Sequence, residues 1–91
     1  MSHTIREKQK LINRVRRIKG QVEGIERMLE EEKGCEEVMQ LIAGVRGAIN
    51  GLMGEVLEDH IRMHIAAEGL VQKDRDDGAS ELIDVVRAYL K

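Results

Sequence analysis

Four side chains in this sequence can bind a transition-metal ion, and their spacing limits how they can meet. They are one cysteine and three histidines: Cys35, His3, His60 and His64. His60 and His64 are four residues apart, so on a helix both rings share a face and can reach one ion. A thiolate with up to three imidazoles suits a borderline divalent ion such as Ni(II), Co(II) or Zn(II). The alternative is structural, with the cysteine as a small buried hydrophobe and the histidines as core or surface residues.

The first part of the chain has the chemistry to contact nucleic-acid phosphates. Residues 1–20 carry seven basic groups and one acid, whereas the whole chain has 15 basic and 17 acidic residues and a net charge of −2. One face of a helix here would present Lys10, Arg14, Arg17 and Gln21, with Arg16 and Lys19 beside them. We expect this face to contact phosphates, and a solvated basic helix is the alternative. Arg46 is a lower-ranked candidate, because it lies among apolar residues and can instead pair with a buried acid or with Asn50.

Long helices must position these side chains. Apolar residues recur at spacings of 4, 3, 4, 3 and 4 over 11–29 and again over 38–56, which is a heptad pattern. The first helix is predicted to begin near Thr4, a plausible N-cap, and to end near Glu32, because Lys33-Gly34 is a C-cap signal. No segment alternates with period two, so no strand is expected.

The second helix is predicted over about 35–67. The polar stretch 68–79 is predicted to be a loop, after which Ser80 can cap a short third helix over 80–90. The predicted fold class is therefore all-α, a long antiparallel two-helix hairpin plus a short C-terminal helix. We expect residues 1–91 to form a single helical domain that carries both the candidate metal ligands and the candidate DNA-contacting face.

Apolar residues on more than one face of the long helices predict self-association. A two-helix hairpin hides one stripe and leaves another exposed, which favours a helical homo-oligomer. A monomeric three-helix bundle is the alternative, but its third helix would be too short to cover both long ones. In a straight helix Cys35 lies about 37 Å from His60, so they can meet only between two antiparallel copies of the second helix. His3 can approach from the same end as the hairpin folds back.

Several function classes are disfavoured by what the sequence lacks. One cysteine excludes an intrachain disulfide. The sequence contains no run of 18 apolar residues, so no membrane-spanning helix is predicted. The N-terminal sequence has no apolar signal core, so a cytoplasmic location is expected. There is no glycine-rich phosphate loop and no Ser-His-Asp or Cys-His-Asn arrangement, so the chain is not expected to be an enzyme.

The segments RVRRIKGQVEGIERMLEE and LIAGVRGAINGLMGEVLEDHI, with Cys35 between them, closely resemble the CsoR/RcnR/FrmR family of all-helical bacterial transcriptional repressors. The resemblance covers essentially the whole chain. It implies a helical-bundle dimer that pairs into a homotetramer, binds operator double-stranded DNA when empty, and releases it when an inducer occupies a site between subunits. The positions that match the family's ligands are Cys35, His60, His64 and His3, and Ser2 is a further candidate donor through its backbone or amine.

The ligand set resembles the nickel/cobalt-responsive branch of this family. A single thiol serves Cu(I) poorly and provides half of what persulfide sensing needs, and the formaldehyde branch uses an N-terminal proline that this chain lacks. The resemblance thus implies a repressor released by Ni(II) or Co(II), with Zn(II) as an alternative ion in vitro, that controls metal efflux or detoxification genes. RVRRI and RAYLK also resemble the formaldehyde-responsive branch, so a repressor that responds to formaldehyde through Cys35 is the alternative. A plain oligomerisation module would explain the apolar stripes but not the cysteine and histidine placement.

Overall fold

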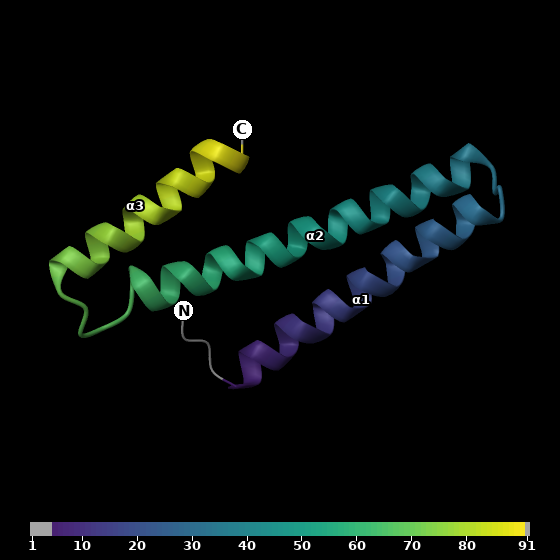
Figure 1. Ribbon diagram of the computed structural model, residues 1–91. Coiled ribbons are helices and arrows are strands. Elements are labelled where there is room, and N and C mark those ends of the chain that lie inside the picture. The colour runs from purple at the N-terminus through teal and green to yellow at the C-terminus, as the bar shows by residue number, and fades with distance from the viewer. Residues whose placement is uncertain (1–4, 91) are drawn as a thin grey trace. The chain divides into compact units, whose positions relative to one another are not determined.

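The computed structural model describes residues 5–90, and within them it has three helices and no strand. These are α1 (Ile5–Glu30), α2 (Cys35–His64) and α3 (Gln72–Tyr89) (Figure 1). The all-α prediction of a hairpin followed by a third helix is confirmed. None of the helices in the described part of the chain is long and apolar enough to cross a membrane. The predicted N-cap Thr4 and the candidate donors His3 and Ser2 lie outside the described residues.

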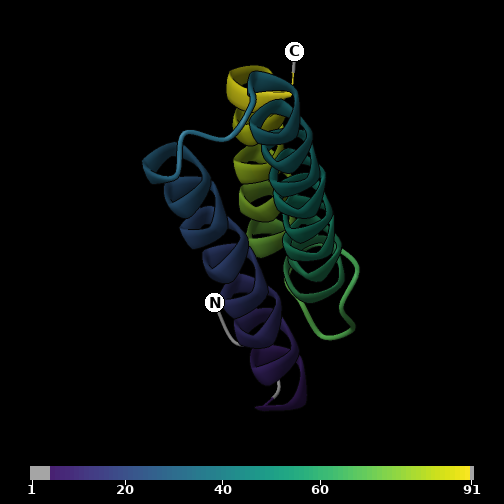
Figure 2. The same cartoon turned by 90° about the vertical axis from the view of Figure 1, so that its right-hand side faces the viewer.

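The described residues fall into two compact units, the first ending at Met53 and the second beginning at Gly54, so that α2 contributes to both. In the first unit α1 runs antiparallel to the first part of α2 (Figures 1 and 2). The buried apolar side chains of the described residues are Ile18 on α1 and Val38 and Val45 on α2. Residues of the two predicted heptad stripes therefore form the contact between the helices.

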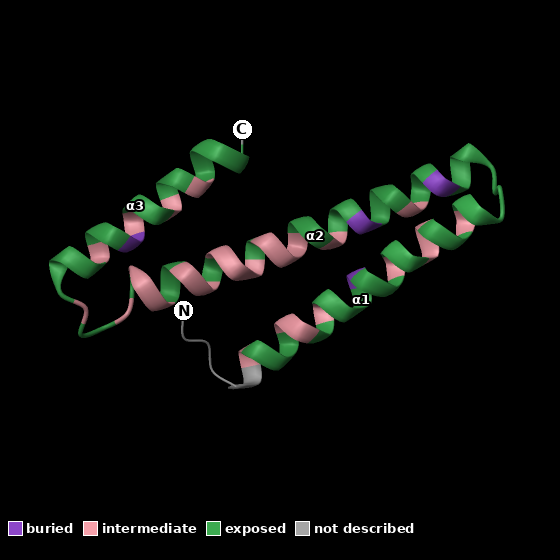
Figure 3. Cartoon of the chain, in the orientation of Figure 1, coloured by how far each residue is buried: buried purple, intermediate pink, exposed green. Residues whose placement is uncertain are grey.

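The other half of each heptad stripe stays exposed in the first unit (Figure 3). On α1 the exposed fractions are 48% for Val15, 48% for Val22 and 62% for Leu29, residues that follow one another at intervals of seven. On α2, Ile42 and Ile49 are each 48% exposed at the same interval. A single chain thus leaves apolar side chains uncovered at heptad spacing, as the sequence predicted for a hairpin without a partner.

The turn between α1 and α2 uses a different residue from the predicted one. We expected α1 to end near Glu32 with a glycine cap at Gly34, but the helix ends at Glu30 and the left-handed residue is Glu32, with φ 56°. The Lys33 amide donates to the Met28 carbonyl at 3.0 Å, and the Glu32 amide donates to the Leu29 carbonyl at 3.2 Å. This pattern is a Schellman motif, which satisfies carbonyls at the helix end but normally places glycine at the left-handed position.

Replacing Glu32 by glycine should therefore stabilise the protein. A non-glycine residue in the left-handed region costs about 1 kcal/mol or more, so Glu32→Gly is expected to raise the free energy of unfolding by about 1 kcal/mol. Glu30→Gly is the matched control, because Glu30 is helical and glycine costs about 1 kcal/mol there. Chemical denaturation at fixed protein concentration measures both, and a loss of stability in Glu32→Gly would contradict the assignment of this turn.

The third helix begins eight residues earlier than predicted, at Gln72 rather than at Ser80. The expectation of a loop over 68–79 is therefore wrong for residues 72–79, because the polar side chains there support a helix. Gln72 donates to Asp76 at 2.7 Å, and Lys73 pairs with Asp77 at 2.8 Å, each one helical turn apart. The hydrogen bond and charge of Asp77 raise the pKa of Lys73. Such pairs stabilise an exposed helical turn that carries little apolar surface.

The end of α2 also differs from the prediction, at His64 rather than Ala67. The Ile61 carbonyl accepts hydrogen bonds from the amides of Ile65 and Ala66, at 3.1 and 2.8 Å. The next carbonyls accept from a side chain, since Arg75 of α3 donates to the carbonyl of Ile65 at 2.5 Å and to that of Ala67 at 3.0 Å. This arginine caps the C-terminal end of α2, where a cation is also favoured by the helix dipole.

Candidate metal centre and nucleic-acid interface

The two candidate metal ligands of the second unit lie together at the end of α2. The ring centroids of His60 and His64 are 5.0 Å apart, with the rings tilted by 36°. The i, i+4 spacing predicted this proximity. Imidazole nitrogens bind divalent ions at about 2.0–2.1 Å, so two rings this close can share one ion after a small side-chain adjustment. The donor chemistry of the pair therefore fits a borderline divalent metal.

One nitrogen of His60 is held by α3. Its Nε2 lies 2.8 Å from the carbonyl oxygen of Gly78, and the side chain is only 16% exposed. A carbonyl oxygen can only accept, so Nε2 carries the hydrogen and donates it. In the neutral ring the lone pair then resides on Nδ1, which makes Nδ1 the nitrogen that can bind a metal. A carboxylate oxygen of Glu81 lies 4.0 Å from the same Nε2.

Gly78 brings α3 close enough for this hydrogen bond. It is buried, and a Cβ built on it would overlap the backbone carbonyl oxygen of His64 and lie 3.1 Å from the His64 Cβ. Together with Arg75, Gly78 fixes α3 against the turn of α2 that carries both histidines. Sequence reasoning missed these two positioning residues, because it interpreted their polar, glycine-containing segment as a loop. The glycine within a charged run was the available signal.

The candidate thiolate lies in the other compact unit. Cys35 is the first residue of α2, and its thiol is free and exposed. Within residues 5–90 no group of three or more His, Cys, Asp or Glu side chains is arranged to hold a metal ion. The described part of one chain therefore brings together His60 and His64 but does not complete a site with Cys35. His3 and Ser2 fall outside the described residues.

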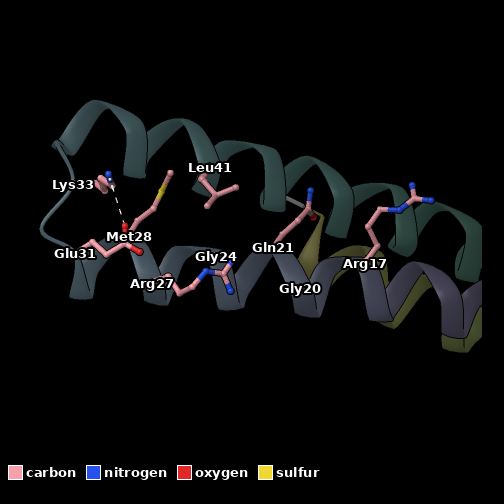
Figure 4. A pocket seen from close by; sticks show the side chains of 9 residues that line it. All are labelled: Arg17, Gly20, Gln21, Gly24, Arg27, Met28, Glu31, Lys33 and Leu41. Carbon is pink, nitrogen blue, oxygen red and sulfur yellow. Dashed lines mark ion pairs between the residues drawn. The ribbon is translucent and has the colours of Figure 1, made fainter.

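The candidate phosphate-contacting residues lie on α1 as predicted, with two levels of exposure. Four are exposed, namely Lys10, Arg16, Arg17 and Lys19, while Arg14 and Gln21 are partly buried. Arg17 and Gln21 line an open hollow of about 500 Å³ in the first unit, together with Arg27 and Lys33 (Figure 4). Arg27 and Lys33 were not among the predicted residues, because they lie in an acidic stretch of sequence. The hollow adds two cations to the basic side of α1, although Lys33 also pairs with Glu31 at 3.8 Å.

The lower-ranked candidate Arg46 is exposed on α2. It lines an apolar hollow of about 270 Å³ together with Asn50 and three isoleucines, Ile25, Ile42 and Ile49. No polar or charged residue in the described part of the chain is buried. The described residues of one chain therefore offer Arg46 no buried acid as a partner, and Asn50 lines the same hollow.

Arg17 provides the most direct test of the α1 face. Arg17→Ala is expected to weaken DNA binding, and the slope of log affinity against log salt should fall by about one unit for each phosphate that the variant no longer neutralises. Arg87→Ala, which removes an exposed arginine from α3, is the matched control and should leave both quantities unchanged. Fluorescence anisotropy with a labelled duplex at several salt concentrations measures them. Normal affinity and slope in Arg17→Ala would remove α1 from the DNA-contacting surface.

Comparisons with known proteins match this chain to transcriptional regulators. Residues 7–88 match a family described as metal-sensitive transcriptional repressors. The chain is 52% identical over its whole length, and over the whole length of the relative, to an uncharacterized protein in the bioA 5′ region of Serratia marcescens. It is 45% identical, again over both full lengths, to a protein named transcriptional repressor RcnR homolog from Escherichia coli.

Two solved structures share the fold. One is a Glu-to-His variant of the formaldehyde-responsive regulator FrmR from Salmonella enterica serovar Typhimurium, with a TM-score of 0.90 and 41% identity, covering 97% of this chain and 99% of that one. The other is the copper-sensing repressor CsoR with Cu(I) from Geobacillus thermodenitrificans, with a TM-score of 0.90 and 25% identity, covering 100% of this chain and 94% of that one.

Proposed function

Because the chain belongs to the CsoR/RcnR/FrmR family of metal-sensitive transcriptional repressors, we propose that it binds operator DNA in its metal-free form and releases it when Ni(II) or Co(II) binds. The family and the structural neighbours are transcriptional regulators rather than enzymes. The genes under its control would then encode metal efflux or detoxification. Zn(II) is expected to occupy the same site in vitro, since it accepts the same donors.

The observation that carries the choice of ligand is the histidine pair at the end of α2. The ring centroids of His60 and His64 lie 5.0 Å apart. Because His60 Nε2 donates to the carbonyl oxygen of Gly78, Nδ1 is the ring nitrogen left to bind an ion. Cys35 supplies the thiolate, and His3 with the Ser2 amine or backbone supplies further donors. When bound, the ion supplies a cross-link between donors on different subunits. This donor set, with one thiolate and several imidazoles, favours nickel or cobalt over Cu(I).

The proposed assembly is a cytoplasmic homotetramer built from two helical-bundle dimers. The exposed heptad stripes of α1 and α2 support self-association, because they present apolar side chains at the spacing that helix packing requires. In an antiparallel pair of α2 helices, Cys35 of one subunit lies at the same end as His60 and His64 of the other. The tetramer would present several copies of the basic α1 face to double-stranded DNA, which multiplies the phosphate contacts.

The formaldehyde-responsive alternative has its own support. Cys35 is an exposed free thiol, and one structural neighbour is a variant of a formaldehyde-responsive regulator. Operator binding measured with Ni(II), Co(II), Zn(II), Cu(I) or formaldehyde separates the two proposals. Release by nickel and cobalt supports the metal-responsive repressor, and release by formaldehyde alone would replace it with the alternative.

His3 has a separate role in this proposal. It lies 11 residues before Arg14 in the sequence, so recruiting it to the metal would draw the N-terminal segment away from DNA. His3→Ala should therefore retain substantial metal binding through Cys35, His60 and His64 and lose much of the release of DNA. Metal titration and operator anisotropy on the same preparation measure the two properties. Full release by nickel and cobalt in His3→Ala would exclude this part of the mechanism.

A further inference from the structure

One glycine of α2 is packed differently from its neighbours on the same helix. A Cβ built on Gly51 would overlap Nη1 of Arg14 and lie 3.5 Å from its Cζ. Cβ atoms built on Gly44 and Gly47 of the same helix would have no heavy atom within 4 Å. The guanidinium of Arg14, on α1, therefore lies against the backbone of α2 at Gly51. Among the described glycines of the first unit, only Gly51 is a position where an added side chain would displace an arginine.

The absence of a side chain at Gly51 leaves room for a residue of the basic face at this place. Arg14 belongs to the same α1 face as Lys10 and Arg17, yet it is partly buried whereas those two are exposed. A guanidinium is planar and rigid, so one whose Nη1 end is placed against a glycine loses little freedom when it subsequently binds a phosphate. Because Arg14 stays partly exposed, a phosphate can still approach it. The contact therefore pre-arranges a phosphate-binding group rather than hiding it.

We infer that Gly51 is a positioning residue for DNA binding, which acts by seating the Arg14 guanidinium on α2 in the orientation that receives a phosphate. The inference rests on the proposed repressor function. It assigns to α2 a role in presenting the basic face of α1, because the seat and the arginine come from different helices. This position of the Arg14 guanidinium requires glycine at residue 51, since even a methyl group there would overlap Nη1.

The geometry makes the substitution Gly51→Ala a clean experiment. The atom that a methyl group would meet is the far end of a flexible side chain, so Arg14 can swing aside without moving either helix. Alanine also favours a helix more than glycine does, so thermal stability is expected to rise. Gly47→Ala is the matched control, because it makes the same change one turn away in open space and should raise stability to a similar degree.

Operator affinity in the metal-free full-length protein is the main readout. Gly51→Ala should bind roughly three- to tenfold more weakly than wild type, the scale expected for ordering one long side chain on binding. Its salt slope should stay unchanged, because the displaced arginine still reaches a phosphate. Arg14→Ala should lower the slope by about one unit for each phosphate that it no longer neutralises, and adding Gly51→Ala to it should cause no further weakening. Gly47→Ala should bind as wild type.

A second readout tests, without DNA, whether Gly51 allows the Arg14 side chain to be ordered. The Nε–Hε order parameter of Arg14, measured by nitrogen-15 relaxation, should be high in wild type and in Gly47→Ala and low in Gly51→Ala. Equal order parameters, equal operator affinities of the two alanine variants, tighter binding by Gly51→Ala, or additive effects in the double variant would each overturn the inference. A wild-type protein with a seated Arg14 that binds no operator would instead count against the proposed function alone.

Discussion

Cys35→Ala should lower the affinity for Ni(II) and Co(II) by more than about 100-fold. Changes to residues that only support metal ligands cost about 10–100-fold, and Cys35 is the sole thiol of the chain, so no other side chain can replace its thiolate. His64→Leu should have a comparable effect, because it leaves one imidazole at the end of α2. Competition with a chromophoric chelator measures the affinity, and the thiolate-to-nickel charge-transfer band should disappear in Cys35→Ala.

The same variants carry their own control. Neither Cys35 nor His64 belongs to the buried contact of α1 with α2, and both changes only remove ligand atoms, so we expect the oligomeric state and the metal-free affinity for operator DNA to stay unchanged. Sedimentation and anisotropy measure both. A Cys35→Ala protein that binds nickel as tightly as wild type would exclude Cys35 from the metal site.

Gly78→Ala is the second change with a large expected effect. Its methyl group would overlap the carbonyl oxygen of His64, and backbone cannot swing aside, so α3 must move away from the end of α2. Overpacking of this kind typically costs about 1–3 kcal/mol of stability. Because His60 Nε2 would lose its acceptor on Gly78, metal affinity should also fall, by about 10–100-fold.

Gly54→Ala is the matched control for that experiment. Gly54 also belongs to the second unit, but a Cβ there would have no heavy atom within 4 Å. The variant should gain about 1 kcal/mol from helix propensity and retain wild-type metal affinity. If Gly78→Ala matched Gly54→Ala in both stability and nickel affinity, the docking of α3 would have no part in arranging the histidines.

The sequence predicts the parts of the fold that depend on local periodicity. The heptad stripes predict both long helices, and the short connection between them makes the helices antiparallel neighbours, with Ile18, Val38 and Val45 buried. The start of α3 could not be predicted in this way. Its first turns contain almost no apolar residue, and they are supported by side-chain pairs and by Arg75, whose partners are carbonyls at the end of another helix. Propensity alone also pointed to Gly34 rather than Glu32 at the left-handed position.

The candidate site divides along the same line. The pairing of His60 and His64 follows from their spacing on one helix, which is a local property. The anchoring of His60 by Gly78 depends on the tertiary position of α3, which no periodic pattern encodes. The approach of Cys35 to the histidines depends on a second chain, so the sequence yields it only as a proposal. Tertiary and quaternary contacts therefore account for the features that sequence reasoning missed or left open.

Metal and DNA are expected to bind to this protein with negative coupling. The most direct measurement is the Ni(II) affinity of the full-length wild-type protein with and without saturating operator DNA. Since coupling between two ligands is reciprocal, operator DNA should weaken nickel binding by the same factor by which nickel weakens DNA binding, on the order of 5–150-fold. Nickel affinity that is unchanged or increased by operator DNA would contradict the account.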